Sequence, residues 1–101
     1  MARKSVIARE LKRQKIVFAN KEKREYLSSR RSDVNLTHEE RQEAQLLLQK
    51  MSRDSSASRL RNRCVLTGRP RGVCKRFNLS RTQLREQAML GNVPGLKKAS
   101  W

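Results

Sequence analysis

The chain has 101 residues, 36% of them hydrophobic, and its 25 Lys and Arg against 9 Asp and Glu give a net charge of +16. So short and polar a chain forms one domain at most and buries only a modest core. Its charge favours a polyanionic partner, because phosphates relieve the repulsion between the cations and release counterions on binding. We expect this partner to be nucleic acid, ahead of an anionic membrane or an acidic protein, and to hold part of the chain in place.

Several function classes lack their usual signals. No apolar run approaches the roughly 20 residues that span a bilayer, and Met1–Ser5 lacks the apolar stretch of a secretory signal. Cys64 and Cys74 are too few for a disulfide framework, and we expect both thiols to be reduced. His38 has no evident nucleophile partner, and no phosphate-binding or dinucleotide-binding loop is present. We therefore expect no enzyme, no cofactor, no membrane and no small-molecule substrate.

Charge divides the chain into blocks. Met1–Glu25 has nine basic and three acidic residues, Tyr26–Ser52 has four of each, and Arg53–Arg85 has ten basic and one acidic. The positive charge thus falls in two separate patches, and the neutral block between them is expected to pack. We predict an N-terminal helical extension over residues 1–52 and an RNA-binding core over residues 53–101.

The first block predicts a helix, because it is rich in helix formers and no Gly or Pro occurs before Gly68. Ile7, Leu11 and Phe18 fall near one face and are expected to be apolar contacts. The basic residues elsewhere on the helix suit either a solvated surface or a helix that follows phosphates, and the charge favours the second. The candidates for phosphate binding in this block are Arg3, Lys4, Arg9, Lys12 and Arg13.

The neutral block predicts an amphipathic helix. Thr37 and Glu40 have the spacing of a capping box, in which each side chain bonds the backbone amide of the other. His38 lies in the first turn and is expected to be solvated. The apolar stripe that follows is either core or a docking face for a protein neighbour. It comprises Ala44, Leu47, Leu48 and Met51.

The C-terminal half begins with loop chemistry and ends with a helix. Residues 53–59 are small and polar, and Gly68–Gly72 predicts a turn within a short hairpin from Cys64 to Phe77. A last helix is predicted from Arg81 to Leu90. Its signals are a second capping box, a hydrophobic staple, a C-terminal glycine and a following proline. These signals lie at Ser80 and Gln83, at Leu79 and Leu84, at Gly91 and at Pro94. Leu84 and Ala88 are expected on its inner face, and Arg81 and Arg85 on an outer one.

Arginine outnumbers lysine nine to one between Arg53 and Arg85. A guanidinium offers donors in a planar fork that grips phosphate with two bonds and stacks on bases. With Gly, Ser and Asn interleaved, such a segment suits irregular folded RNA better than the groove of DNA. The RNA-binding candidates of this half are Arg53, Arg59, Arg61, Arg63, Arg69, Arg71, Lys75, Arg76, Arg81, Arg85, Lys97, Lys98 and Trp101.

Two other classes are compatible with the charge. A free nucleic-acid-binding regulator is the first alternative, because charge and arginine usage do not identify a complex. A cationic membrane-active peptide is the second, but it needs a large apolar face opposite the charge, which Arg53–Arg85 lacks.

Several motifs in order resemble the bacterial small-subunit ribosomal protein family fourteen. They are Met1–Ser5, Arg53–Ser56, Arg59–Gly72, Lys75–Arg81 and Val93–Trp101, so that the resemblance covers the whole length and is strongest in the second half. It implies a structural constituent that binds 16S-type rRNA in the 3′ domain of the subunit head, aids assembly and lies near the aminoacyl-tRNA decoding site. It further implies the third, tenth and nineteenth small-subunit proteins as neighbours, and a location in cytoplasmic ribosomes or in an organelle with bacterial-type ribosomes.

The same resemblance implies how the C-terminal part folds. The zinc-binding branch of the family has two Cys-x-x-Cys pairs, at the positions of Cys64 and Thr67 and of Ser80 and Gln83. Only Cys64 retains a thiol, and Cys74 lies outside the pattern, so we expect no metal and place the chain in the zinc-free branch. The expected fold is mainly α with irregular extended segments: an N-terminal basic helix, a middle amphipathic helix, and a zinc-ribbon-like hairpin plus helix without zinc.

Overall fold

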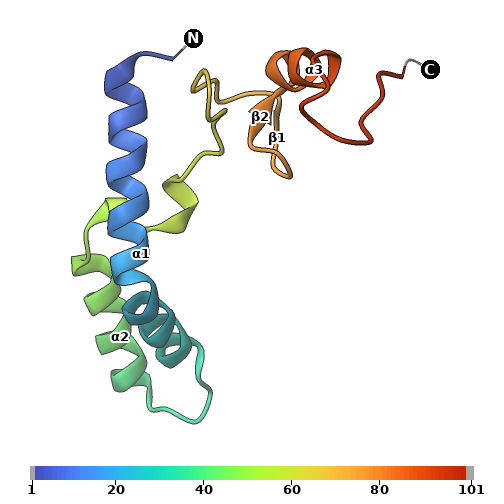
Figure 1. Ribbon diagram of the computed structural model, residues 1–101. Coiled ribbons are helices and arrows are strands. Elements are labelled where there is room, and N and C mark those ends of the chain that lie inside the picture. The colour runs from blue at the N-terminus through green and yellow to red at the C-terminus, as the bar shows by residue number, and fades with distance from the viewer. Residues whose placement is uncertain (1, 100–101) are drawn as a thin grey trace. The chain divides into compact units, whose positions relative to one another are not determined.

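The computed structural model describes residues 2–99 (Figure 1). As predicted, the fold is mainly helical, with irregular segments and one small hairpin. Helices α1 (Lys4–Ser32), α2 (His38–Lys50) and α3 (Arg81–Met89) are joined by the short 3-10 turns η1 (Arg53–Ser55) and η2 (Ala57–Arg59) and by the strands β1 (Val73–Cys74) and β2 (Leu79–Ser80). The chain forms two compact units, one of Arg9–Leu60 and one of Met1–Ala8 with Arg61–Trp101. No helix within residues 2–99 has the length and apolarity to cross a membrane.

Helix α1 has 29 residues and continues seven residues past the block that predicted it. The expected apolar face is wrong in part, because Leu11 is 53% exposed and Phe18 is 84% exposed. The inner face of α1 within the unit Arg9–Leu60 includes polar side chains instead. Arg24 donates from Nη1 to Ser55 Oγ at 2.9 Å, and Arg13 pairs with Asp54 at 3.5 Å. Because α1 packs against the polar segment that carries η1, its inner face cannot be found from apolar periodicity alone.

The predicted capping box of α2 is confirmed. Thr37 Oγ1 accepts from the Glu40 amide at 3.4 Å, and Glu40 Oε2 accepts from the Thr37 amide at 3.1 Å. The apolar stripe is narrower than predicted. Ala44 is 2% exposed, Leu48 and Met51 are half-buried, and Leu47 is 48% exposed.

The hairpin lies further along the chain than predicted. Strands β1 and β2 pair Val73 with Ser80 and Cys74 with Leu79, so the turn is at residues 75–78 and not at Gly68–Gly72. Asn78 adopts a positive φ of 54° there, which Asn tolerates better than most residues. The glycine segment begins in a separate loop, Cys64–Arg69, which is closed by backbone hydrogen bonds of its own.

Two backbone bonds close the loop Cys64–Arg69. The Cys64 amide donates to the Arg69 carbonyl at 3.0 Å, and the Gly68 amide donates to the Cys64 carbonyl at 2.8 Å. Gly68 is buried, has φ +74°, and would place a Cβ only 2.8 Å from Ile7 Cδ1. Glycine is therefore required here both for the left-handed backbone and for the close approach of α1.

Helix α3 begins and ends at the predicted caps. Ser80 Oγ accepts from the Gln83 amide at 3.5 Å, which is one of the two bonds of the predicted box. At the other end Gly91 has φ +74°, the Gly91 amide donates to Ala88, and the Asn92 amide donates to Gln87. This is a Schellman motif, and it ends the helix at Met89 with Leu90 as the C-cap.

Candidate nucleic-acid interface

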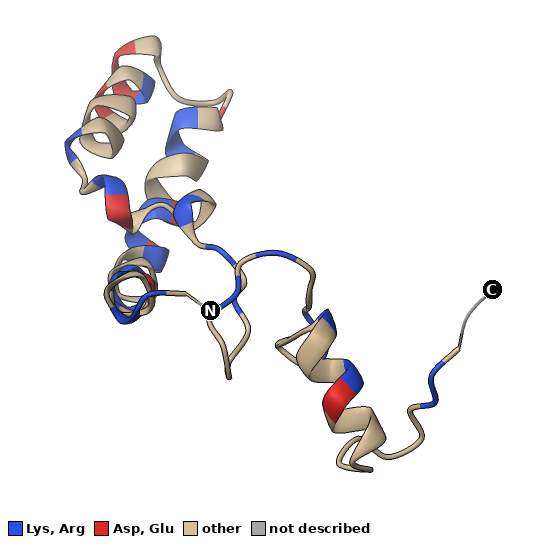
Figure 2. Cartoon of the chain, turned by 90° about the horizontal axis from the view of Figure 1, so that it is seen from above, with Lys and Arg blue, Asp and Glu red and all other residues tan. Residues whose placement is uncertain are grey.

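Basic residues occur along both units, while acidic residues are few (Figure 2). Most of the predicted RNA-binding residues are exposed, and Trp101 lies outside the described residues. Three are half-buried, namely Arg13, Arg63 and Arg69. The exposed ones are Arg3, Lys4, Arg9, Lys12, Arg53, Arg59, Arg61, Arg71, Lys75, Arg76, Arg81, Arg85, Lys97 and Lys98.

Two of these arginines donate hydrogen bonds to the backbone of the protein itself. Arg63 donates from Nη1 to the Gly68 carbonyl, and Arg61 donates from Nε to the Pro70 carbonyl, each at 3.0 Å. Both bonds tie the start of the arginine-rich segment to its own glycine-containing loop. The sequence treats all arginines of this segment alike, whereas the structure separates those that shape the loop from those that extend into solvent.

A second pair of arginines is engaged by Asp54. Its carboxylate lies 2.6 Å from Arg59 Nη1 and 3.5 Å from Arg13 Nε, within the unit Arg9–Leu60. Asp54 is the one acidic residue among the ten cations of Arg53–Arg85, and this contrast is a signal that the sequence prediction left unused. Asp54 thus sets the positions of two predicted RNA-binding side chains.

The start of the chain and the arginine-rich loop belong to the same unit. The Ala2 amide donates to the Thr67 carbonyl at 3.2 Å, and Ile7 packs over Gly68. Arg3 and Lys4 are therefore held next to the loop Cys64–Arg69, although about sixty residues separate them in sequence. The sequence predicted two basic patches, and the structure joins the beginning of the first to the second.

The environment of Cys64 shows whether the remaining ligand positions fit zinc. The thiol is 3% exposed, and burial raises its pKa. Hydrogen bonds from the Thr67 side chain and from the amides of Ser80, Thr67 and Leu66 oppose this effect and lower the pKa of Cys64 to about 6. Zinc would need further thiolate or imidazole ligands. Within residues 2–99 no three His, Cys, Asp or Glu side chains gather where they could hold a metal, so the donor set does not fit zinc.

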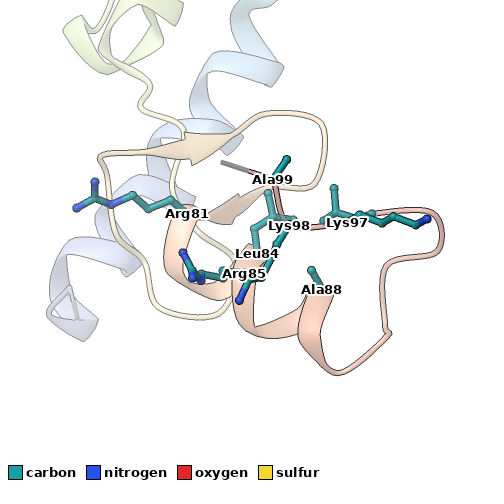
Figure 3. Close-up of a pocket in the computed structure, with 8 residues that line it drawn as sticks. Arg81, Leu84, Arg85, Ala88, Lys97, Lys98 and Ala99 are labelled. Carbon is teal, nitrogen blue, oxygen red and sulfur yellow. The ribbon is translucent and has the colours of Figure 1, made fainter. Parts of the chain in front are cut away.

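A groove of about 470 Å³ lies between α3 and the tail that follows it (Figure 3). Arg81, Leu84, Arg85 and Ala88 line it from the helix, and Leu96 to Ala99 line it from the tail. The sequence placed the two arginines on a different face from Leu84 and Ala88. In agreement with this expectation, Leu84 and Ala88 are half-buried and the two arginines are exposed, but all four side chains line the same groove.

Comparison with known proteins supports a ribosomal assignment for this basic, arginine-braced surface. A family model for ribosomal protein S14p/S29e matches residues 47–100. The small ribosomal subunit protein uS14 of Francisella tularensis subsp. novicida is 54% identical over 101 residues, and the match covers all of both chains. The proteins of the same name from Chlamydia trachomatis serovar L2 and Chlamydia muridarum are each 50% identical over the same full length. The chain therefore belongs to the S14p/S29e family of ribosomal proteins.

Proposed function

We propose that this protein binds the 16S-type rRNA of the small-subunit head, in its 3′ domain, and supports subunit assembly and the rRNA conformation near the aminoacyl-tRNA decoding site. As a family member it is a structural, non-enzymatic ribosomal protein of the small subunit. The proposal adds the rRNA domain and the region of the subunit, which follow from the resemblance of its motifs.

The observation that carries the proposal is the state of the arginine-rich segment. Its backbone is irregular yet fixed by the loop bonds at Cys64–Arg69 and by the arginine-to-carbonyl bonds of Arg61 and Arg63. Arg71, Lys75 and Arg76 remain exposed on this framework. A cationic surface that is ordered before binding loses less conformational entropy when it meets phosphates. This suits a fixed position on a folded RNA.

We include protein neighbours in the proposal, namely the third, tenth and nineteenth small-subunit proteins. The exposed Leu11 and Phe18, seven residues apart on α1, support an apolar contact with a protein outside the RNA. The division into an extension over residues 1–52 and an rRNA-binding core over residues 53–101 is likewise part of the proposal. So are the zinc-free branch and the RNA-binding roles of the exposed cations.

Arg71 offers the sharpest test of rRNA binding. It is exposed, and within residues 2–99 no hydrogen bond or ion pair engages its guanidinium. If it grips phosphate with two bonds, Arg71→Lys keeps the charge but loses the fork, so affinity for a 3′-domain rRNA fragment falls while the salt dependence stays constant. Arg71→Ala also lowers the slope of log affinity against log salt by about 0.7–0.9.

The control is Lys21→Ala, which removes one exposed charge from α1 at a position outside the predicted set. It should change affinity less than Arg71→Ala does. Equal affinities for wild type and Arg71→Lys would show that Arg71 acts only through its charge and does not grip phosphate with two bonds. A wild-type protein that does not discriminate the 3′-domain fragment from unrelated RNA would refute the proposed rRNA site.

A further inference from the structure

The groove between α3 and the C-terminal tail is formed by two local features, the end of the helix and a turn in the tail. The Schellman motif at Gly91 ends the helix, and a turn at Pro94 and Gly95 reverses the chain, with the Leu96 amide donating to the Val93 carbonyl at 3.5 Å. Pro followed by a residue of positive φ is the pattern of a type II turn, and Gly95 has φ +76°. The tail therefore returns along α3 and forms one wall of the groove.

The two walls differ in chemistry from an ordinary charged surface. All the charged side chains that line the groove are cations, namely Arg81 and Arg85 from α3 and Lys97 and Lys98 from the tail. Between them lie apolar groups of Leu84, Ala88 and Leu96, each half-buried. Figure 3 shows Arg81 and Arg85 projecting from the helix and Lys97 extending away from it along the tail. The one acidic residue of α3, Glu86, lies outside the lining.

This combination matches one kind of occupant. The cations neutralise a phosphodiester, while the aliphatic floor beside the guanidinium groups accepts the apolar face of a base or a ribose. A volume of about 470 Å³ is in the range that encloses a small ligand, and an RNA duplex offers no unstacked base to enter it. An acidic peptide would satisfy the charges, but the apolar residues of α3 in the floor, Leu84 and Ala88, span only about one turn and give a docked helix little to bury.

We infer that this groove binds an unpaired nucleotide of the rRNA, with its phosphate on the cations and its base or ribose against Leu84, Ala88 and Leu96. The inference rests on the proposed rRNA binding and adds the class of RNA element that the groove takes. A bulged or looped nucleotide extruded from a helix provides both groups at once, as sequence-specific RNA recognition commonly requires. Arg81 and Arg85 hold the phosphate on the side of α3, and Lys98 closes the side of the tail.

The test separates the base pocket from the charges. Ala88→Leu fills the floor without changing charge, and leucine is a good helix former. It should lower the affinity for a single-stranded RNA decamer and for the 3′-domain fragment by about five- to tenfold, as expected when part of the apolar contact between the floor and the base is lost, with an unchanged salt slope. Binding to a blunt-ended RNA duplex of ten base pairs should change less than about twofold, because a fully paired duplex has no free base for the floor.

Two further variants keep the test decisive. Ala19→Leu makes the same change at an exposed position of α1 and should leave all three affinities close to those of wild type. Arg85→Gln should lower the affinity for the decamer and reduce the slope of log affinity against log salt by about one phosphate contact, roughly 0.7. This variant tests the groove independently if Ala88→Leu perturbs the helix. Circular dichroism of each variant checks that α3 is retained.

The outcomes distinguish this inference from the proposed function. If wild type binds the 3′-domain fragment and Ala88→Leu binds it equally well, the groove is not a nucleotide site while the rRNA proposal stands. Equal losses of affinity for the decamer and for the blunt-ended duplex would also overturn the inference. If Ala88→Leu lowers the affinity for a polyglutamate peptide and leaves the affinities for the RNA probes unchanged, the groove binds an acidic protein segment and the inference is wrong.

Discussion

Replacing Gly68 by alanine should detach the start of α1 from the arginine-rich loop. The new Cβ would lie 2.8 Å from Ile7 Cδ1, 2.9 Å from Ile7 Cγ1 and 3.1 Å from Ala2 Cβ, on a backbone with φ +74°. The left-handed conformation costs alanine about 1 kcal/mol, and overpacking adds about 1–3 kcal/mol. We therefore expect the free energy of opening this loop to fall by about 2–4 kcal/mol.

Gly91 provides the matched control. It has the same φ of +74°, but a Cβ at this position would meet no heavy atom within 4 Å. Gly91→Ala should incur only the conformational cost, about 1 kcal/mol, and should act on the end of α3. Native-state amide exchange separates the two effects. The Cys64 and Val65 amides, which donate to Arg69 and Asn78, report the loop, and the Asn92 amide, which donates to Gln87, reports the helix end.

Gly68→Ala should lower the protection of the Cys64 and Val65 amides by roughly 30- to 1000-fold, while Gly91→Ala should leave both unchanged. Adding Ile7→Ala to Gly68→Ala should recover part of the loss, with a coupling energy of about 0.5–3 kcal/mol. If the two glycine variants lose equal protection at their own sites and Ile7→Ala shows no coupling, the close approach of α1 to Gly68 is wrong.

Three further predictions address the charges, the thiol and the metal. Asp54→Asn should lower the free energy of unfolding by at most about 1 kcal/mol, because the ion pairs of Asp54 with Arg13 and Arg59 are partly solvated. The same change frees both arginines, so it should steepen the salt dependence of rRNA binding by up to two phosphate contacts, and a shallower slope would contradict the pairing role of Asp54. The pKa of Cys64 is lowered from 9.0 to about 6, so between these pH values the unfolded state holds a proton on the thiol that the folded state has lost. The free energy of unfolding should therefore rise between pH 6 and pH 9 by up to about 1.4 kcal/mol per pH unit, and the thiol should contribute nothing below pH 6. Urea unfolding of wild type and Cys64→Ala across this range tests it, and equal pH profiles would refute it. Elemental analysis should find no stoichiometric zinc in the purified protein, and zinc that survives chelation would overturn the zinc-free assignment.

The features that could be predicted from the sequence are those whose hydrogen bonds join near neighbours in the chain. The capping box at Thr37 and Glu40, the cap at Ser80 and the glycine at Gly91 each involve residues within five positions, so residue type and spacing suffice to predict them. The excess of arginine, which is a matter of composition, pointed to nucleic acid. The order of the motifs pointed to the family, and the full-length relatives confirmed it.

Only the folded chain reveals three other features. They are the buried face of α1, the position of the hairpin turn, and the arginines that bond the protein's own backbone. The face of α1 depends on Ser55 and Asp54, which bond residues about thirty to forty positions earlier, and the loop at Gly68 depends on Ile7. An arginine that donates to a backbone carbonyl and an arginine whose guanidinium is exposed to solvent have the same local sequence signature. They differ only in whether the folded chain brings a carbonyl within hydrogen-bonding distance, and no local sequence pattern records that distance.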